Sequence, residues 1–371
     1  MTTSVRSRIV TTAGIGLAAV AAILTTILWT PMPTQAQEGA VAKLYADLYK
    51  LDPTERRQRL LEGARKEGKA DLQPNFRGSD GDKMREVFFA ENPGVEAAFD
   101  RTPSQSAAER LIAEARAGRH SVDVVGGAVT DQSAIYDKKL YAPYPTPATQ
   151  AILPKYRNFI DPQNRWSLSH WQDHGMAYNP SLVKAGEEPR KWEDLCEPRF
   201  KGSISFDPSE TRLLSGLYTM YNGDWNKIEA LIKCIGENEP IVMLGHPTRL
   251  MLMMAGDHAV QGENFFYKGT ELNRKNPKKA PFKAVYEAPV FAYAEGFVVN
   301  ANAPHPHTAA LYLDWVLGPT SQKMIGELWR GTFTVPHPFH PDDITLITFG
   351  EMDVKVIDRL HGYWAKYVGR R

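Results

Sequence analysis

Residues 245–249, with the sequence GHPTR, could bind an anion. They follow the apolar run 241–244, which predicts a buried strand, and they place Arg249 in the first turn of the next helix. The helix dipole opposes a positive charge there by about 0.3–1 kcal/mol, so the charge needs a negative partner. That partner is either an anionic ligand or a carboxylate such as Asp257 or Glu263. We predict that Arg249 contacts a ligand.

A second possible anion site lies at residues 207–210. The sequence DPSE predicts the start of a helix, and a helix N-terminus attracts anions. Asp207 can cap that helix itself, and Glu210 in its first turn repels a second negative charge. We therefore favour a capping role for Asp207, and we keep Ser209 and Thr211 as ligand candidates because they follow the predicted strand 203–206.

Tyrosine and histidine side chains could hold a metal ion. Fe(III) prefers phenolate and carboxylate oxygens, but no two tyrosines are adjacent in this sequence. Tyr218 and Tyr221 have the spacing of one packed helix face. Four histidines stand among prolines, without a cysteine or carboxylate at a recognised zinc spacing. These are His305, His307, His337 and His340. We predict no metal site and no cofactor.

Motifs of hydrolytic enzymes are absent from the sequence. There is no Gly-x-Ser-x-Gly and no His-Glu-x-x-His, and the pair Asp173-His174 has no identifiable nucleophile at a strand-to-helix turn. We therefore predict a protein that is not an enzyme.

The chain has two cysteines, Cys196 and Cys234. Cys234 lies on the helical apolar pattern of residues 225–235. In an oxidising compartment the two can form a disulfide, which stabilises the fold by about 3–4 kcal/mol in the chain-entropy model. We predict this disulfide; the alternative is two separate buried thiols.

The N-terminal residues predict export. Arg6 and Arg8 precede the uncharged stretch 9–29, and a small-residue pattern ends at Ala36. This organisation is that of a signal peptide, residues 1–36, although the apolar stretch is also long enough for an uncleaved membrane anchor. In either case the rest of the chain is predicted to lie outside the cytoplasm.

Length and charge limit the remaining possibilities. The chain has 371 residues, too many for one compact core, so we expect two lobes. Lys and Arg total 44 while Asp and Glu total 43, so the chain lacks the positive excess of nucleic-acid-binding proteins.

Helices and strands are predicted to alternate, which indicates parallel sheets flanked by helices. The first set has a helix after Asp52, strands at 70–73, 95–99 and 122–125, and helices that end near 92 and 118. The passage 166–178 then predicts a first crossover between lobes. The second set comprises strands 203–206, 240–244 and 258–260 with helices 225–235 and 247–255. Strand 295–299 and helices 307–317 and 321–329 are expected to return to the first sheet.

Ligands of such sheets bind at the carboxyl ends of the strands. This rule and the predicted return crossover select ten candidate ligand-binding residues: Arg77, Gly78, Ser79, Gly127, Ser209, Thr211, His246, Arg249, Tyr286 and Tyr293. Some have structural alternatives. Gly127 could serve only a tight turn, Arg77 could be a solvated loop charge, and Tyr293 could be a packed hinge aromatic.

Five segments carry a resemblance to a known family. They are LEGARKEGK at 61–69, FFAENPGV at 88–95, EARAGRHSVDVV at 114–125, WEDL at 192–195 with FKGSI at 200–204, and NAPHPHTAA at 302–310 with GPTSQ at 318–322. In order and spacing, over residues 54–335, the chain resembles the bacterial periplasmic solute-binding proteins of ABC transporters, in the family that includes ferric-iron binders.

The resemblance implies an α/β fold of the two-lobed type II periplasmic-binding-protein class. Each lobe is then a mainly parallel sheet flanked by helices, and two crossover strands join the lobes. We assign residues 37–170 and 290–350 to the first lobe, 171–289 to the second, and 351–371 to a C-terminal helix.

The implied function is the periplasmic solute-binding component of an ABC uptake transporter. We expect a monomer that captures a small organic anion or zwitterion by hinge closure and delivers it to an inner-membrane permease with its ATPase. Alternatives are a ferric-iron binding protein, a ligand-binding partner of a membrane sensor, and an exported hydrolase.

Overall fold

The computed structural model describes residues 34–76, 78–99, 103–337, 340–341, 343–350 and 352–369. The predicted export signal lies outside these residues except for Thr34 to Ala36, which begin the first helix. In the described part of the chain, no helix has both the length and the apolar character needed to span a membrane.

The first lobe is built on a parallel sheet. β1 pairs in parallel with both β2 and β3, as the alternation of helices and strands predicts. Asp52 caps α2, where its carboxylate accepts hydrogen bonds from the backbone N–H groups of Thr54 and Glu55. The elements are α1 (Thr34–Tyr49), α2 (Pro53–Glu67), β1 (Lys69–Gln73), α3 (Gly78–Glu91), β2 (Glu96–Ala98), α4 (Ser104–Arg116), β3 (Val124–Ala128), η1 (Val129–Gln132), α5 (Ser133–Asp137), η2 (Pro147–Ala151) and η3 (Pro154–Phe159).

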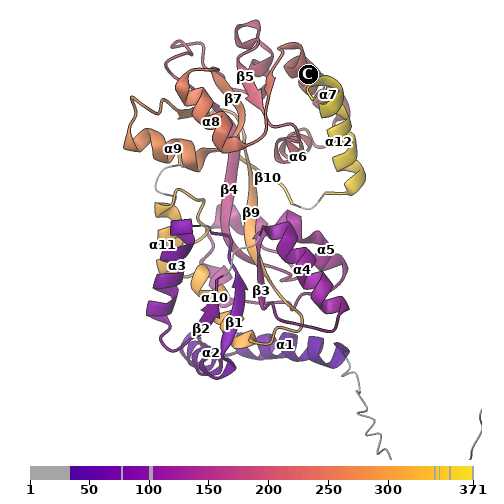
Figure 1. Cartoon of the computed structure of the whole chain (residues 1–371), viewed down its shortest axis with the longest axis vertical. Helices are drawn as coiled ribbons and strands as arrows, with labels where there is room; N and C mark the ends of the chain where they lie inside the picture. Colours follow the sequence, from indigo (N-terminus) through magenta and orange to yellow (C-terminus); the bar gives the residue numbers. More distant parts are fainter. Residues whose placement is uncertain are drawn as a thin grey trace, which may run out of the picture. The chain divides into compact units, whose positions relative to one another are not determined.

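Two long strands, β4 (Ser167–Tyr178) and β9 (Val290–Val299), connect the lobes (Figure 1). They pair antiparallel, from Ser167 opposite Phe297 to His174 opposite Phe291. β9 also pairs with β3 of the first lobe, and β4 pairs with β7 of the second. The strands therefore form one continuous sheet in the order β2-β1-β3-β9-β4-β7-β5-β6.

The second lobe repeats the parallel arrangement. β5 pairs in parallel with β6 on one side and β7 on the other. The elements are η4 (Trp192–Cys196), η5 (Pro198–Phe200), β5 (Ile204–Phe206), α6 (Thr211–Met220), α7 (Trp225–Glu237), β6 (Ile241–Val242), α8 (His246–Ala255), β7 (Val260–Phe265), α9 (Phe266–Lys275) and β8 (Lys283–Ala284).

A third connection runs beside the two crossover strands. After α10 (Pro306–Val316) and α11 (Pro319–Glu327), the strand β10 (Leu346–Thr348) pairs in parallel with β9. The chain then enters α12 (Val354–Tyr367), which packs against α6 and α7 (Figure 1). The sequence prediction included β4 and β9 but not β10.

Each lobe has its own hydrophobic core. Leu72, Phe88 and Tyr312 belong to the core of the first lobe, where α10 packs on α2. Trp192, Phe206 and Trp364 belong to that of the second. Because Trp364 is fully buried there, α12 is an integral part of the second lobe.

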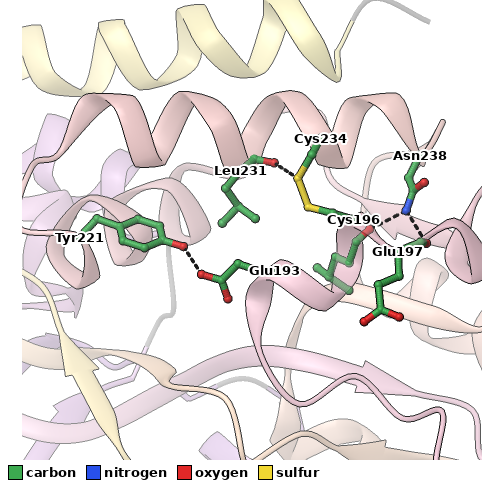
Figure 2. Close-up of a disulfide and its surroundings, with 8 residues drawn as sticks. Glu193, Cys196, Glu197, Tyr221, Leu231, Cys234 and Asn238 are labelled. Carbon is green, nitrogen blue, oxygen red and sulfur yellow. Dashed lines mark hydrogen bonds between the residues drawn. A yellow bond between two sulfur atoms is a disulfide. The ribbon is translucent and has the colours of Figure 1, made fainter.

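The predicted disulfide between Cys196 and Cys234 is present and joins η4 to α7 (Figure 2). The two Cα atoms are 5.3 Å apart. Hydrogen bonds on either side of it hold η4 to the end of α7 and to the residue that follows α6. The Asn238 side chain donates to the backbone carbonyls of Leu195 and Glu197 at 2.8 Å each, and the Tyr221 hydroxyl donates to Glu193 at 2.6 Å. The disulfide is therefore one of several links between η4 and α7.

Candidate functional site

A cavity of about 610 Å³ lies at the junction of the two lobes. Its walls come from both lobes and from the crossover strands. The first lobe contributes Asn75, Asp80, Gly127, Asp131 and Arg330; the second contributes Arg212, His246, Phe265 and Tyr267; β4 and β9 contribute Gln172, Tyr293 and Glu295. A ligand in this cavity would touch both lobes at once.

Arg212 projects from the first turn of α6 toward the first lobe. Its guanidinium lies 4.9 Å from the centre of the Tyr293 ring and 4.0 Å from the Asp131 carboxylate. The residue before α6, Glu210, has a left-handed backbone (φ 31°) and no side-chain cap on the helix. The start of α6 thus presents Arg212 and uncapped backbone N–H groups, both of which favour an anion.

Arg330 follows α11 and reaches from the first lobe to the second. Its guanidinium stacks on the Tyr267 ring at 3.6 Å from the ring centre, a cation–π contact. Nη1 donates to the side-chain oxygen of Gln172 at 3.4 Å, and Nη2 lies 3.9 Å from the Asp80 carboxylate. Only 14% of the side chain is exposed, so the charge is largely withdrawn from water.

Glu295 lies on β9, in the wall of the same cavity. Its carboxylate accepts a hydrogen bond from the Asn75 side chain at 3.1 Å and one from the Tyr293 hydroxyl at 3.4 Å. Burial raises the pKa of Glu295 to about 7, even though Arg212 acts to lower it. The carboxyl is therefore partly protonated near neutral pH.

A smaller recess of about 220 Å³ adjoins this cavity in the second lobe and shares Arg212 and His246 with it. Its other lining residues are Asp207, Ser209, Glu210, Thr211 and Glu263. Asp207 does not cap α6 as the sequence predicts. Its carboxylate instead accepts from the backbone N–H groups of Ser209 and Gly245, and so ties the start of α8 to the end of β5.

Behind the recess is a buried cluster of charged groups. Arg249 is fully buried and lies 3.4 Å from Glu210 and 3.5 Å from Glu263, whose carboxylate also contacts His174 and His246. Burial acts to raise the pKa of Glu263. His246 and His174 act in the opposite direction and outweigh burial, so the pKa is held well below the usual value. The pKa of Glu210 is raised well above its usual value by burial and by Glu263. Arg249 thus has carboxylate partners of its own, one of them the predicted alternative, Glu263.

The structure brings some of the predicted ligand residues together. Gly127, His246 and Tyr293 line the main cavity, and Ser209, Thr211 and His246 line the recess. Gly78 lines a different cavity of the first lobe, beside Phe76 and Phe99, and Ser79 is exposed on α3.

The remaining predicted residues lie elsewhere. Tyr286 packs edge-on against Phe266 and faces His340, and Arg249 is buried behind the recess. Arg77 lies outside the described residues. Among the residues that the structure describes, no group of three or more His, Cys, Asp or Glu side chains is placed to hold a metal ion.

Sequence reasoning missed Arg212, Arg330 and Glu295. Arg212 directly follows the candidate Thr211, so the strand-end rule could have included it. The strand-end rule selects neither Arg330, which follows the last predicted helix, nor Glu295, which begins the predicted strand 295–299 rather than ending it. Their place in the cavity depends on the return of the chain through β9 and α11.

The comparisons with known proteins agree with this architecture. The family model described as bacterial extracellular solute-binding protein matches residues 127–343, more than half of the chain. Among curated proteins, none matches this chain.

Solved structures share the fold at low sequence identity. One is the spermidine/putrescine ABC transporter substrate-binding protein PotD from Streptococcus pneumoniae, with 17% identity, a TM-score of 0.65, and coverage of 81% of this chain and 98% of that one. A second is iron-bound HitA from Pseudomonas aeruginosa, with 13% identity, a TM-score of 0.65, and coverage of 81% and 99%. A third is AfuA from Actinobacillus pleuropneumoniae with fructose-6-phosphate bound, with 20% identity, a TM-score of 0.60, and coverage of 81% and 98%. AfuA is described as a periplasmic binding protein, and the three proteins are named with different solutes: spermidine/putrescine, iron and fructose-6-phosphate.

Proposed function

Because this chain belongs to the family of bacterial extracellular solute-binding proteins, we propose that it captures a small organic anion or zwitterion in the cavity between its lobes. The observation that carries this proposal is the pair Arg212 and Arg330, which line one cavity from opposite lobes. A guanidinium presents a rigid fork of donors that matches carboxylate and phosphate oxygens. The rings of Phe265, Tyr267 and Tyr293 offer apolar contact to the rest of the solute.

Capture couples to closure of the lobes. A solute that touches both Arg212 and Arg330 stabilises the closed arrangement by its greater affinity for that arrangement. The contacts of Arg330 with Tyr267 and of Arg212 with Asp131 already cross between the lobes, so the solute adds to an existing interface. We assign the protein to the periplasm, where the closed, loaded form delivers solute to an inner-membrane ABC permease and its ATPase.

The protein is proposed to bind the solute without converting it. Ferric iron is the competing ligand, since HitA is a structural neighbour with iron bound. A thermal-shift screen of the purified protein against carboxylates, amino acids, phosphate esters and ferric citrate separates these possibilities. Product analysis of each hit then tests for turnover, and steady conversion of a hit would contradict the binding role.

The cavity is tested by titration calorimetry with a hit from the screen. Arg330→Gln removes a charged hydrogen-bond donor from the cavity, so we expect the affinity to fall roughly tenfold to a hundredfold. Arg165→Gln is the matched control, because Arg165 also pairs with an aspartate (Asp161, 3.1 Å) and lies over the Tyr136 and Trp166 rings, with 21% of its side chain exposed. Equal loss of affinity in both variants, or in neither, would contradict the assignment of the cavity.

A further inference from the structure

The carboxylates of the main cavity differ in their partners. Asp80 lies 3.9 Å from Arg330, and Asp131 lies 4.0 Å from Arg212. In the part of the chain that the structure describes, the hydrogen-bond partners of Glu295 are both neutral: the Asn75 amide and the Tyr293 hydroxyl. Within the described residues, no Lys, Arg or His nitrogen lies within 4.0 Å of the Glu295 carboxylate. Among the described residues, Glu295 is therefore a cavity carboxyl group without an ion-pair partner.

This carboxyl group is within reach of a ligand. Glu295 lines the cavity and is half-buried, so it is neither sealed in the core nor free in bulk solvent. Its two hydrogen bonds fix it from opposite lobes, because Asn75 follows β1 while Tyr293 lies on the part of β9 that packs in the second lobe. A carboxylate can accept more than two hydrogen bonds, so these contacts leave room for another donor.

Resting on the proposed function, we infer that the solute is a zwitterion and that Glu295 receives its ammonium group, while its anionic group lies at Arg212 and Arg330. An ammonium ion supplies three hydrogen-bond donors and a positive charge. It would therefore give Glu295 the cationic partner that the described residues do not provide. The inference narrows the solute class from organic anions in general to those that also carry a basic nitrogen, such as amino acids.

The charges around Glu295 support a proton-linked binding step. The charged groups that face it are Arg212 on α6, Asp131 on η1 and Arg330 after α11, while His170 on β4 is opposite it in register. Burial raises the pKa of Glu295 and favours the neutral form of His170, whose pKa is lowered. An ammonium placed on Glu295 favours the carboxylate, so binding near neutral pH should release a proton.

The test compares three forms of one molecule. The screening probes are the twenty L-amino acids, and each hit is then compared with its analogue without the amino group and its analogue without the carboxylate. We expect the amino acid to bind roughly tenfold to a hundredfold more tightly than either analogue. Glu295→Gln should reduce this preference for the amino group, while Glu86→Gln, which removes an exposed carboxylate on α3 of the first lobe, should not.

Calorimetry in buffers of different ionisation enthalpy adds a second readout. Proton release on binding is expected in the wild type near pH 7 and is expected to be lost in Glu295→Gln. If analogues without the amino group, other carboxylates or phosphate esters bind as tightly as amino acids, the inference is overturned and the proposed function stands. If no probe of any class binds, the proposed function fails together with the inference.

Discussion

The disulfide between Cys196 and Cys234 gives a stability prediction with a defined magnitude. The two cysteines are 38 residues apart in the sequence. In the chain-entropy model, cross-linking a loop of that length removes freedom from the unfolded chain and stabilises the fold by about 4 kcal/mol at 25 °C. The double variant Cys196→Ser/Cys234→Ser should therefore lower the free energy of unfolding by about 4 kcal/mol.

The native contacts explain why the folded state should survive this change. Asn238 still donates to the carbonyls of Leu195 and Glu197, and Tyr221 still donates to Glu193. These bonds hold η4 to the end of α7 and to the residue after α6 without the cross-link, so the loss of stability should come mainly from the greater freedom of the unfolded chain.

The assay is equilibrium unfolding in guanidinium chloride, followed by circular dichroism, for oxidised wild type and the double variant. Reductant should lower the midpoint of the wild type and leave that of the double variant unchanged. Solute affinity should be the same in both proteins, because the disulfide lies outside the main cavity. An unfolding free energy that is equal in the two proteins would refute this reasoning.

Two further predictions concern buried charge. Arg249→Ala should destabilise the protein by about 3–5 kcal/mol in thermal or chemical denaturation, because it removes the buried guanidinium that pairs with the carboxyl groups of Glu210 and Glu263; a change below about 1 kcal/mol would contradict this role. Glu295 has a pKa raised from 4.5 to about 7, so its contribution to stability is full below about pH 4.5 and is lost as the pH rises through about 7. Between pH 4.5 and pH 8 the free energy of unfolding of the wild type should fall by at most about 3 kcal/mol relative to that of Glu295→Gln, and partial exposure of the side chain reduces this value. Parallel profiles of unfolding free energy against pH in the two proteins would contradict the prediction.

Local patterns predicted much of the fold. Asp52 with Pro53 marks the start of α2, and the apolar runs mark β3 and the flanking helices, so the parallel alternation follows from spacing alone. The disulfide was predictable because the N-terminal residues predict export, and an oxidising compartment favours pairing of two cysteines. The family resemblance, stated from five short segments, is confirmed by the family model.

The site was less predictable, because its charges are brought together by long-range packing. Arg249 follows a strand end as predicted, but its side chain turns into the interior, where Glu210 and Glu263 compensate it. The predicted return crossover selected Tyr293, two residues before Glu295, but no sequence pattern selected Glu295 or Arg330 themselves. These two residues meet Arg212 only because β9 crosses between the lobes and the chain after α11 returns to β4. The position of these side chains in the cavity depends on the order and direction of the strands, which local sequence patterns do not determine.

A crystal structure of the protein with the tightest-binding solute of the screen tests the central claim most directly. We predict that the solute occupies the cavity between the lobes, with its anionic group at Arg212 and Arg330 and its long axis against the aromatic rings. A solute bound elsewhere, for example in the cavity of about 450 Å³ between α2 and α10 of the first lobe, with the cavity between the lobes empty, would contradict the account.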